Sequence, residues 1–249
     1  MNSSLPKIAI VGYGSMGREI EKAAIRRGFK VTDIFEIDNP IDERQKYNFD
    51  VAIDFTFPDS VIENIRKLSI LRKNIVIGTT GWDAHTEEIK KYVKAHDIGL
   101  VYGSNFSVGM QMFFRIVEQT SKLLDKIENY DVSVHEIHHT RKKDSPSGTA
   151  KSLAEIILKN VNRKKKILEE TVHGSIAPDM LHVTSSRVGE VTGTHTIMLD
   201  SDADSIELIH RAKNRSGFAH GALLATEWIQ GKKGFHDFKD VMSDLWNKV

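Results

Sequence analysis

Cysteine is absent from the 249 residues of this chain. A chain without cysteine forms no disulfide, holds no iron–sulfur cluster or cysteine-ligated zinc, and has no thiol nucleophile. The absence therefore excludes enzymes whose mechanism needs a protein thioester, such as the thioester-forming aldehyde dehydrogenases.

The sequence also lacks a charge imbalance and a long apolar run. Its 35 Lys and Arg against 34 Asp and Glu leave a formal net charge of +1, so nothing predicts nucleic acid or an anionic membrane as a partner. Residues 1–7 contain no apolar signal region, and no run approaches the length of a membrane span. We therefore expect a cytoplasmic protein, long enough for one large or two modest domains.

A dinucleotide-binding pattern begins at the first apolar run, residues 8–11. This run is followed at once by Gly12-Tyr13-Gly14-Ser15-Met16-Gly17 and then by a helical period. In such a motif the first glycine allows a tight turn, the second lets a pyrophosphate approach, and the third lets helix pack on strand. Strand, glycines and helix together predict a Rossmann-type unit, with a phosphate-binding or empty βαβ unit as the alternative.

The nature of the dinucleotide depends on the end of the next predicted strand, residues 29–35. Glu36 follows this strand, at the distance from the glycines where an acid holds a ribose 2′-hydroxyl. Its carboxylate would repel a 2′-phosphate, and no arginine follows it directly, so Glu36 favours NAD over NADP. Asp38 is a second candidate for the same contact.

Three more predicted strands, residues 51–55, 74–77 and 99–102, each end in a small or polar turn. Ligands bind at this carboxyl edge of open parallel sheets. We therefore expect the cofactor cleft to be lined by Gly78-Thr79-Thr80 and by Gly103-Ser104-Asn105-Phe106. The Phe106 ring either packs on a nicotinamide or belongs to the start of the next helix. Between two of the strands, Ser60 to Glu63 is predicted to form a capping box that opens a helix.

A different chemistry is concentrated in residues 135–150. The preceding residues alternate as a strand, with Val132, Val134 and Glu136 on one face. A helical period follows Pro146, which we place in the first turn. This puts Ser147, Gly148 and Thr149 at a helix N-terminus, where unpaired N–H groups and the helix dipole favour an anion.

Histidines and lysines in the same segment add positive charge and proton donors. His138, His139, Lys142 and Lys143 together with the helix start suit one or two carboxylates and a proton transfer. Two alternatives stay open: the two histidines could bind a metal with His135, or the basic residues could be a solvated loop. No spacing matches a known zinc pattern, so we predict no metal.

The remaining residues predict a second domain. A long helix is expected from Ser107, and strands at 180–186, 194–199 and 205–212 follow one another without helices between them. Such runs indicate an α+β domain with a mixed or antiparallel sheet. Residues 163–166 are interpreted as a solvated basic loop, and the chain ends in an apolar helix from Gly217 and a short amphipathic tail. The fold class is thus α/β, with a Rossmann domain at 1–106 and a second domain at 107–216.

Taken together, the motifs resemble those of the 4-hydroxy-tetrahydrodipicolinate reductases, also called dihydrodipicolinate reductases. The resemblance spans nearly the whole chain, and it is carried by the N-terminal glycine motif, Asp54-Phe55-Thr56, Gly78-Thr79-Thr80-Gly81, Asn105-Phe106-Ser107, His138 to Ala150, and Arg215 with Phe218-Ala219 and Gly221-Ala222. Two features depart from the family: the glycine loop is one residue shorter than in many relatives, and Ile37 stands where dual-cofactor members have arginine.

The resemblance implies a Rossmann domain to which residues 217–249 return, and a mixed-sheet substrate domain that also forms a homotetramer. It implies reduction of a cyclic dicarboxylated imine by NADH or NADPH in the diaminopimelate–lysine pathway. Carried over by position, His138 is the proton donor or acceptor, Lys142 the proton donor and His139 a substrate contact, with Gly148 and Thr149 around a carboxylate. The cofactor contacts would be Gly12 to Gly17, Glu36, Gly78 to Thr80, and Gly103 to Phe106. The alternatives are a reductase of another small dicarboxylic imine or keto acid, and a sensor that binds NADH without catalysis.

Overall fold

The structure is a computed structural model that describes residues 5–247. Residues 1–4, 248 and 249, which the predicted N-terminal segment and domain ranges include, lie outside the described residues. The chain forms two compact units. Unit 1 contains the chain up to Val108 and again from Arg215, and unit 2 contains Gly109–Asn214. The predicted boundaries at 106 and 217 each lie two residues from this division.

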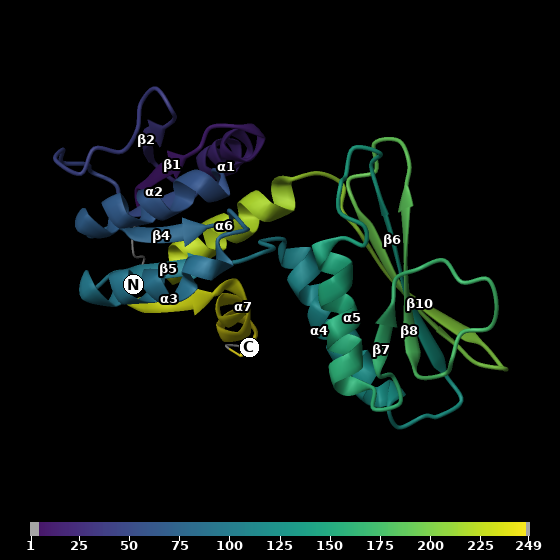
Figure 1. The fold of residues 1–249 in the computed structure, drawn as a ribbon. Coiled ribbons are helices and arrows are strands. Elements are labelled where there is room, and N and C mark those ends of the chain that lie inside the picture. Colours follow the sequence, from purple (N-terminus) through teal and green to yellow (C-terminus); the bar gives the residue numbers. More distant parts are fainter. Residues whose placement is uncertain (1–4, 248–249) are drawn as a thin grey trace. The chain divides into compact units, whose positions relative to one another are not determined.

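Unit 1 is built on a six-stranded sheet in the order β11-β5-β4-β3-β1-β2, with every neighbouring pair parallel (Figure 1). The strands β1 and β3 are buried along their whole length, as continuous apolar runs predict for a parallel sheet covered on both faces. The strands are β1 (Ile8–Val11), β2 (Val31–Phe35), β3 (Val51–Asp54), β4 (Asn74–Ile77), β5 (Gly99–Tyr102) and β11 (Gly234–Asp237).

Helices cover both faces of this sheet, and each face has its own hydrophobic core. On one face Ile10 and Ile53 pack against α1 (Ser15–Arg26), α6 (Ser216–Trp228) and α7 (Phe238–Trp246). On the other face Val11 and Ile75 pack against α2 (Pro58–Ile70) and α3 (Thr86–Ala95), with the short 3₁₀ turn η1 (Asp83–His85) before α3. This doubly covered parallel sheet is the predicted Rossmann architecture.

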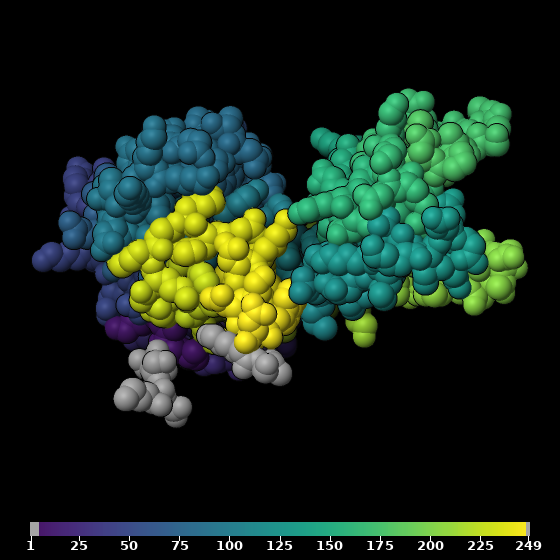
Figure 2. Space-filling model, turned by 90° about the horizontal axis from the view of Figure 1, so that it is seen from below, coloured from purple at the N-terminus to yellow at the C-terminus, as the bar shows by residue number. Residues whose placement is uncertain are grey.

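The C-terminal residues complete unit 1. Strand β11 pairs with β5, with Gly234 opposite Gly99, and α6 packs closely enough that a Cβ on Gly221 would lie 1.8 Å from the carbonyl oxygen of Phe106. Figure 2 shows these yellow residues packed against the blue and purple residues of the same unit. The amphipathic tail is α7, whereas β11 was not predicted.

The strand order of unit 1 indicates at which point along the carboxyl edge of the sheet a ligand is expected to bind. The winding direction of the sheet reverses between β1 and β3, and ligands of open α/β sheets bind outside the carboxyl ends of the strands at such a point. The glycine motif follows β1 and residues 55–57 follow β3. The two turns therefore meet at the position where a dinucleotide is expected.

Unit 2 is a five-stranded mixed sheet in the order β10-β9-β6-β8-β7. Strands β10, β9 and β6 pair antiparallel, and β6, β8 and β7 pair parallel. The helices α4 (Val108–Leu124) and α5 (Gly148–Asn160) lie on one face, where Val132 and Val134 pack with Leu153 and Ile157 (Figure 1). The strands are β6 (Asp131–His138), β7 (Lys166–Leu168), β8 (Met180–Arg187), β9 (Thr194–Asp200) and β10 (Ser205–Arg211).

Two predicted helix starts are wrong. Helix α5 has Ser147 as its N-cap and begins at Gly148, so Pro146 precedes the cap and is not in the first turn. Helix α2 begins at Pro58, because proline at the first helical position loses no intrahelical hydrogen bond. Ser60 therefore lies in the first turn of α2 and is not its cap.

The predicted basic loop at 163–166 is also wrong. Lys164 is 4% exposed, and its Nζ donates to the carbonyl oxygens of Pro178 at 2.9 Å and Met180 at 2.8 Å. Strand β7 then begins at Lys166. A buried ammonium is tolerated here because backbone carbonyls replace water as acceptors and Oδ1 of Asp131, 2.6 Å from Nζ, supplies an opposite charge. Between residues 5 and 247, no helix has the length and apolar character that a membrane span requires.

Candidate active site

The glycine turn after β1 has the form that a dinucleotide site requires. A Cβ on Gly17 would lie 2.2 Å from the carbonyl oxygen of Gly12, and one on Gly12 would lie 2.8 Å from Cγ2 of Thr56. Around Gly14, by contrast, no described atom lies within 4 Å of the Cβ position. The outer glycines therefore allow close packing, and the middle one leaves the space through which a pyrophosphate reaches the start of α1.

A cavity lies beside this turn at the carboxyl ends of β1, β2 and β3. Glu36 lines it, at the end of β2 in a turn closed by hydrogen bonds between the backbones of Glu36 and Asn39, whereas Asp38 lines a separate hollow. Of the two predicted ribose contacts, the structure places Glu36 beside the glycines. The cavity lining is Val11, Gly12, Tyr13, Gly14, Phe35, Glu36, Ile37, Pro40, Ile41, Phe55, Thr56, Phe57, Ser60 and Asn64.

A buried carboxylate organises the turns after β3 and β4. Asp54 is fully buried and accepts hydrogen bonds from the backbone N–H and Oγ1 of Thr56 at 3.0 and 2.7 Å. It also accepts from Nδ2 of Asn64 at 2.9 Å and Oγ1 of Thr79 at 3.2 Å. Burial raises the pKa of Asp54, and these donors oppose the rise. The carboxylate thus fixes Thr79 and the turn at Thr56 relative to each other.

The turns after β4 and β5 are held by aromatic packing. A Cβ on Gly78 would lie 2.1 Å from the ring of Phe55, so only glycine fits there. The Phe106 ring is 1% exposed, with ring centroids 5.9 Å from Phe55 and 4.5 Å from Phe238. This burial favours the alternative, in which Phe106 belongs to the start of the next helix, α4, over stacking of its ring on a nicotinamide. Of the other predicted residues, Thr80 and Ser104 are exposed and Asn105 accepts from the N–H of Ser107.

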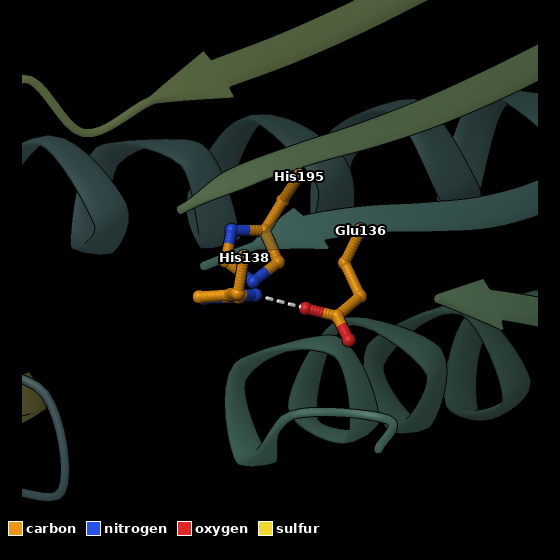
Figure 3. Close-up of side chains that lie close together, drawn as sticks. All are labelled: Glu136, His138 and His195. Atoms are coloured by element: carbon orange, nitrogen blue, oxygen red, sulfur yellow. Dashed lines mark ion pairs between the residues drawn. The ribbon is translucent and has the colours of Figure 1, made fainter. Parts of the chain in front are cut away.

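The histidine site in unit 2 is built on β6. Alternation along this strand places Glu136 and His138 on the buried face, where Glu136 is fully buried and the His138 side chain is 10% exposed. Their side chains form an ion pair between a Glu136 carboxylate oxygen and Nδ1 of His138 (Figure 3). Gly193 lies close to the other ring nitrogen, because a Cβ there would lie 2.9 Å from Nε2 of His138.

The Glu136 carboxylate also holds the start of α5 and the end of β8. Its Oε1 accepts from Nη2 of Arg187 at 2.8 Å and from the backbone N–H of Ser147 at 3.3 Å. Arg187 donates as well to the carbonyl oxygen of Asp144 at 2.6 Å. Burial would raise the pKa of Glu136, but hydrogen bonds from His138 and Arg187 lower it far below its usual range. Glu136 is therefore ionised and connects three parts of the site: the His138 ring, the end of β8 at Arg187 and the start of α5 at Ser147.

The residues predicted to hold an anion lie at the start of α5. Oγ of Ser147 accepts from the N–H of Ala150 at 3.2 Å, which caps the helix. Gly148 is exposed, with open space around its Cβ position among the described residues, and Thr149 is half-buried. The Cα side of Gly148 is thus open, while its backbone N–H hydrogen-bonds the Asp144 carboxylate.

The basic residues of the loop have separate roles. Nζ of Lys142 lies 2.7 Å from Oδ1 of Asp144, and its side chain is 23% exposed. Burial would raise the pKa of Asp144, but the Lys142 ammonium lowers it. Arg141 forms an exposed bidentate pair with Glu190, at 2.5 and 2.6 Å. His139 is half-buried and Lys143 is exposed, so of the two lysines only Lys142 is held by an ion pair among the described residues.

A further histidine lies in the site that the sequence did not predict. His195 of β9 is 4% exposed, and its Nε2 lies 3.3 Å from Oγ of Ser147. Its ring meets the His138 ring edge-on, with centroids 5.2 Å apart (Figure 3). Burial, and then the positive charge of His138, lower the pKa of His195 to about 4. His195 is therefore neutral at physiological pH.

The structure also bears on the alternative that the two histidines bind a metal with His135. His135 lies on the opposite face of β6, where its Nδ1 is 2.7 Å from Oγ1 of Thr184, so it cannot join His138 around one ion. Glu136, His138 and His195 do place possible ligand atoms within 4.8 Å of one another. The Arg187 guanidinium already forms an ion pair with the Glu136 carboxylate. A metal cation bound to the same carboxylate would therefore be repelled by the positive charge of Arg187. A hydrogen-bonded network explains the cluster better.

Three residues of this network were missed by the sequence interpretation. A signal existed for Glu136, since it shares a strand face with Val132 and Val134 and a buried acid needs a partner. Arg187 and His195 reach the site through strand pairing. Arg187 contacts Glu136, which is 51 positions away in the sequence, and His195 contacts Ser147, which is 48 positions away. No short motif connects them to it.

Comparison with known proteins agrees with both units. A family model described as dihydrodipicolinate reductase, N-terminus, matches residues 6–106, and one described as dihydrodipicolinate reductase, C-terminus, matches residues 109–242. The chain is 38% identical to a 4-hydroxy-tetrahydrodipicolinate reductase of Christiangramia forsetii. The alignment spans 242 residues, which is 96% of this chain and 98% of the relative. It is 36% identical to the enzyme of that name from Neisseria meningitidis serogroup B, over 78% of this chain and 72% of the relative.

A solved structure has the same fold. The dipicolinate-bound dihydrodipicolinate reductase of Paenisporosarcina sp. TG-14 matches with a TM-score of 0.75 at 20% identity, covering 95% of this chain and 99% of the other. At this identity the likeness concerns the fold alone, but the family models and the two sequence relatives cover both units. The chain belongs to the dihydrodipicolinate reductase family.

Proposed function

We propose that this protein reduces 4-hydroxy-tetrahydrodipicolinate to tetrahydrodipicolinate with NADH, in the diaminopimelate route to lysine. The observation that carries the proposal is the buried pair Glu136–His138 beside the helix start at Ser147 and Gly148. This arrangement supplies a proton-exchanging group next to an anion cradle, which suits a dicarboxylated substrate. The glycine turn with Glu36 supplies the other requirement, a dinucleotide site.

In the proposed reaction, the protein residues bind a carboxylate and deliver a proton. Ser147, Gly148 and Thr149 hold one substrate carboxylate, and His139 contacts the substrate. Loss of water from 4-hydroxy-tetrahydrodipicolinate would give a conjugated imine, and the nicotinamide, when bound, would supply a hydride to the carbon that carried the hydroxyl. The negative charge that this addition moves onto the ring nitrogen would take a proton, and tautomerisation of the resulting enamine would restore the C=N bond of tetrahydrodipicolinate. Lys142, kept in place by Asp144, is the proposed donor, and His138 is a second proposed donor or acceptor. A donor placed in advance stabilises the negative charge as it develops.

The preference for NADH rests on the cavity beside the glycine turn. Glu36 presents a carboxylate where the ribose hydroxyls of the cofactor would lie, and a 2′-phosphate at that place would meet like charge. The next residue is Ile37, which is 96% exposed and adds no positive charge. The remaining proposed contacts are Gly12 to Gly17, Gly78 to Thr80, and Gly103 to Phe106, the last through its backbone.

The proposal includes a cytoplasmic homotetramer formed through unit 2. In unit 2 the sheet face opposite α4 and α5 carries half-buried residues such as His135 and Thr184, and Met198 on this face is 39% exposed. A sheet face of this kind is suited to packing against a second copy. Light scattering coupled to size-exclusion chromatography should give four times the mass of one 28.1 kDa chain.

The experiment that tests the function is oxidation of NADH and of NADPH, coupled to dihydrodipicolinate synthase with pyruvate and aspartate semialdehyde. We expect fast turnover that requires the synthase, with NADH preferred. A reaction without the synthase is the control. Turnover that appears only with another dicarboxylic imine or keto acid would assign a different substrate, and tight NADH binding without any turnover would favour a sensor.

A further inference from the structure

His195 has no role in the proposed reaction, although its side chain is buried in the candidate active site beside His138 and Ser147. In the pairing of β9 with β6, His195 lies directly opposite Glu136, so its side chain lies on the same face of the sheet as Glu136 and His138 (Figure 3). Its Nε2 contacts Oγ of Ser147 at 3.3 Å. Its Nδ1 is buried and meets no hydrogen-bond partner within residues 5–247.

The charge of His195 limits how it can bond to Ser147. With a pKa lowered to about 4, the imidazole is neutral near pH 7 and carries one proton, on either Nδ1 or Nε2. A proton on Nδ1 would leave a buried donor without an acceptor. A proton on Nε2 leaves Nδ1 as an unpaired acceptor, which buried groups tolerate better than an orphaned donor.

The Nε2–H form determines what the Ser147 hydroxyl does. In this form Oγ of Ser147 accepts two hydrogen bonds, one from the N–H of Ala150 at 3.2 Å and one from His195. Both acceptor positions of the hydroxyl are then used, and its own hydrogen remains to be donated. An ionised carboxylate only accepts hydrogen bonds, so the hydroxyl is matched to such a ligand.

We infer that His195 is a positioning residue that binds Ser147 through Nε2–H and so commits the Ser147 hydroxyl to donate to a substrate carboxylate. This inference rests on the proposed function, because it assigns the residue that prepares the proposed carboxylate cradle. In this inference, strand β9 contributes to substrate affinity through His195, and proton delivery remains the role of Lys142 and His138.

The test compares binding of dipicolinate, a planar dicarboxylate, to the NADH complexes of variants by titration calorimetry. His195→Met removes the N–H donor with little change in volume and should weaken dipicolinate binding about tenfold, the loss of one hydrogen bond. Its KM for the imine should rise by a similar factor while kcat changes less than about twofold and NADH affinity is kept. His195→Gln retains an N–H donor and should recover most of the lost affinity.

Two controls separate this role from a structural one. His210 lies opposite His195 on β10 and packs on Phe113 at 5.9 Å between centroids, so His210→Met should leave dipicolinate affinity unchanged. Ser147→Ala should weaken binding, and the double variant with His195→Met should be no weaker than Ser147→Ala alone, because the two residues act on one hydroxyl.

Each outcome decides the matter. If wild type neither binds dipicolinate nor reduces the imine, the proposed function fails. If wild type does both and His195→Met binds dipicolinate equally well, or its effect adds fully to that of Ser147→Ala, the role of His195 is overturned. Should His195→Met not fold, the comparison of His195→Gln with a donor-free His195→Leu gives the same decision.

Discussion

Glu136 and His138 lie two residues apart on the buried face of β6, and their side chains form an ion pair. The same carboxylate binds Arg187 and the backbone of Ser147. One buried charge thus fixes the ring of the proposed proton-exchanging residue and the start of the anion cradle together. The position of His138 depends on Glu136 more than on the loop that follows.

Replacing Glu136 by glutamine should therefore lower kcat by roughly 10–100-fold, a part of the 10²–10⁴ that a positioned acid or base contributes. It should also lower the thermal unfolding temperature, because Arg187 and His138 lose a buried partner. Steady-state kinetics and thermal denaturation measure both. Glu190→Gln, which breaks only the exposed pair with Arg141, is the matched control and should change neither. Wild-type kcat in Glu136→Gln would contradict the positioning role.

Lys142 and Lys143 provide a second matched pair, since they are neighbours in the sequence with different surroundings. Lys142 is held by Asp144 at 2.7 Å, whereas Lys143 is exposed. Lys142→Ala should lower turnover by roughly 10²–10⁴ and keep NADH binding, as expected when a proton donor is removed. Lys143→Ala should stay within about twofold of wild type. Equal losses in both variants would indicate that general positive charge, and not a proton donor, is what the loop supplies.

The cofactor preference should respond to two residues at the end of β2. Ile37→Arg adds a guanidinium that can bind a 2′-phosphate, and Glu36→Ser removes the carboxylate that opposes it. The double variant should shift the ratio of kcat/KM for NADPH over NADH by at least about tenfold toward NADPH, a gain of one charge-assisted contact. The coupled assay with both cofactors measures it. A ratio unchanged from wild type would mean that neither residue meets the ribose.

The parts of the molecule that could be predicted from the sequence are those whose causes are local. The glycine turn follows the buried strand β1, Glu36 follows the partly buried strand β2, and Ser147 has the side chain that a helix N-cap requires. Their positions are set by residues within one βαβ unit or one helical turn. The sequence therefore predicted the glycine turn after β1 and the helix N-terminus at Ser147 and Gly148.

The parts that were missed depend on strand pairing over long distances. Arg187 and His195 meet Glu136 because β8 and β9 flank β6, and neither strand contains a signal for that order. Strand β11 is four residues with no apolar alternation, and it exists because Gly234 pairs with Gly99. Lys164 is buried because the carbonyls of Pro178 and Met180 surround it. Such partners become visible only in three dimensions.

The low pKa of His195 predicts a specific dependence of stability on pH. The folded state has a pKa of about 4, below the value of about 6.5 in an unfolded chain, so protonation favours unfolding. The contribution of the neutral imidazole is complete above about pH 6.5 and is lost as pH falls toward 4. It amounts to roughly 3 kcal/mol over the whole range, of which about 2 kcal/mol is lost between pH 7 and 5.

Urea denaturation of wild type and His195→Met at several pH values between 7 and 5 isolates this contribution, because the other titrating groups are common to both proteins. The free energy of unfolding of wild type should fall more steeply with decreasing pH than that of the variant, so that the gap between the two curves changes by about 2 kcal/mol. Parallel curves would mean that His195 titrates normally in the folded protein. In that case the imidazole would be partly charged near pH 6.5, and the buried Nδ1 of His195 would carry a proton that meets no acceptor within residues 5–247.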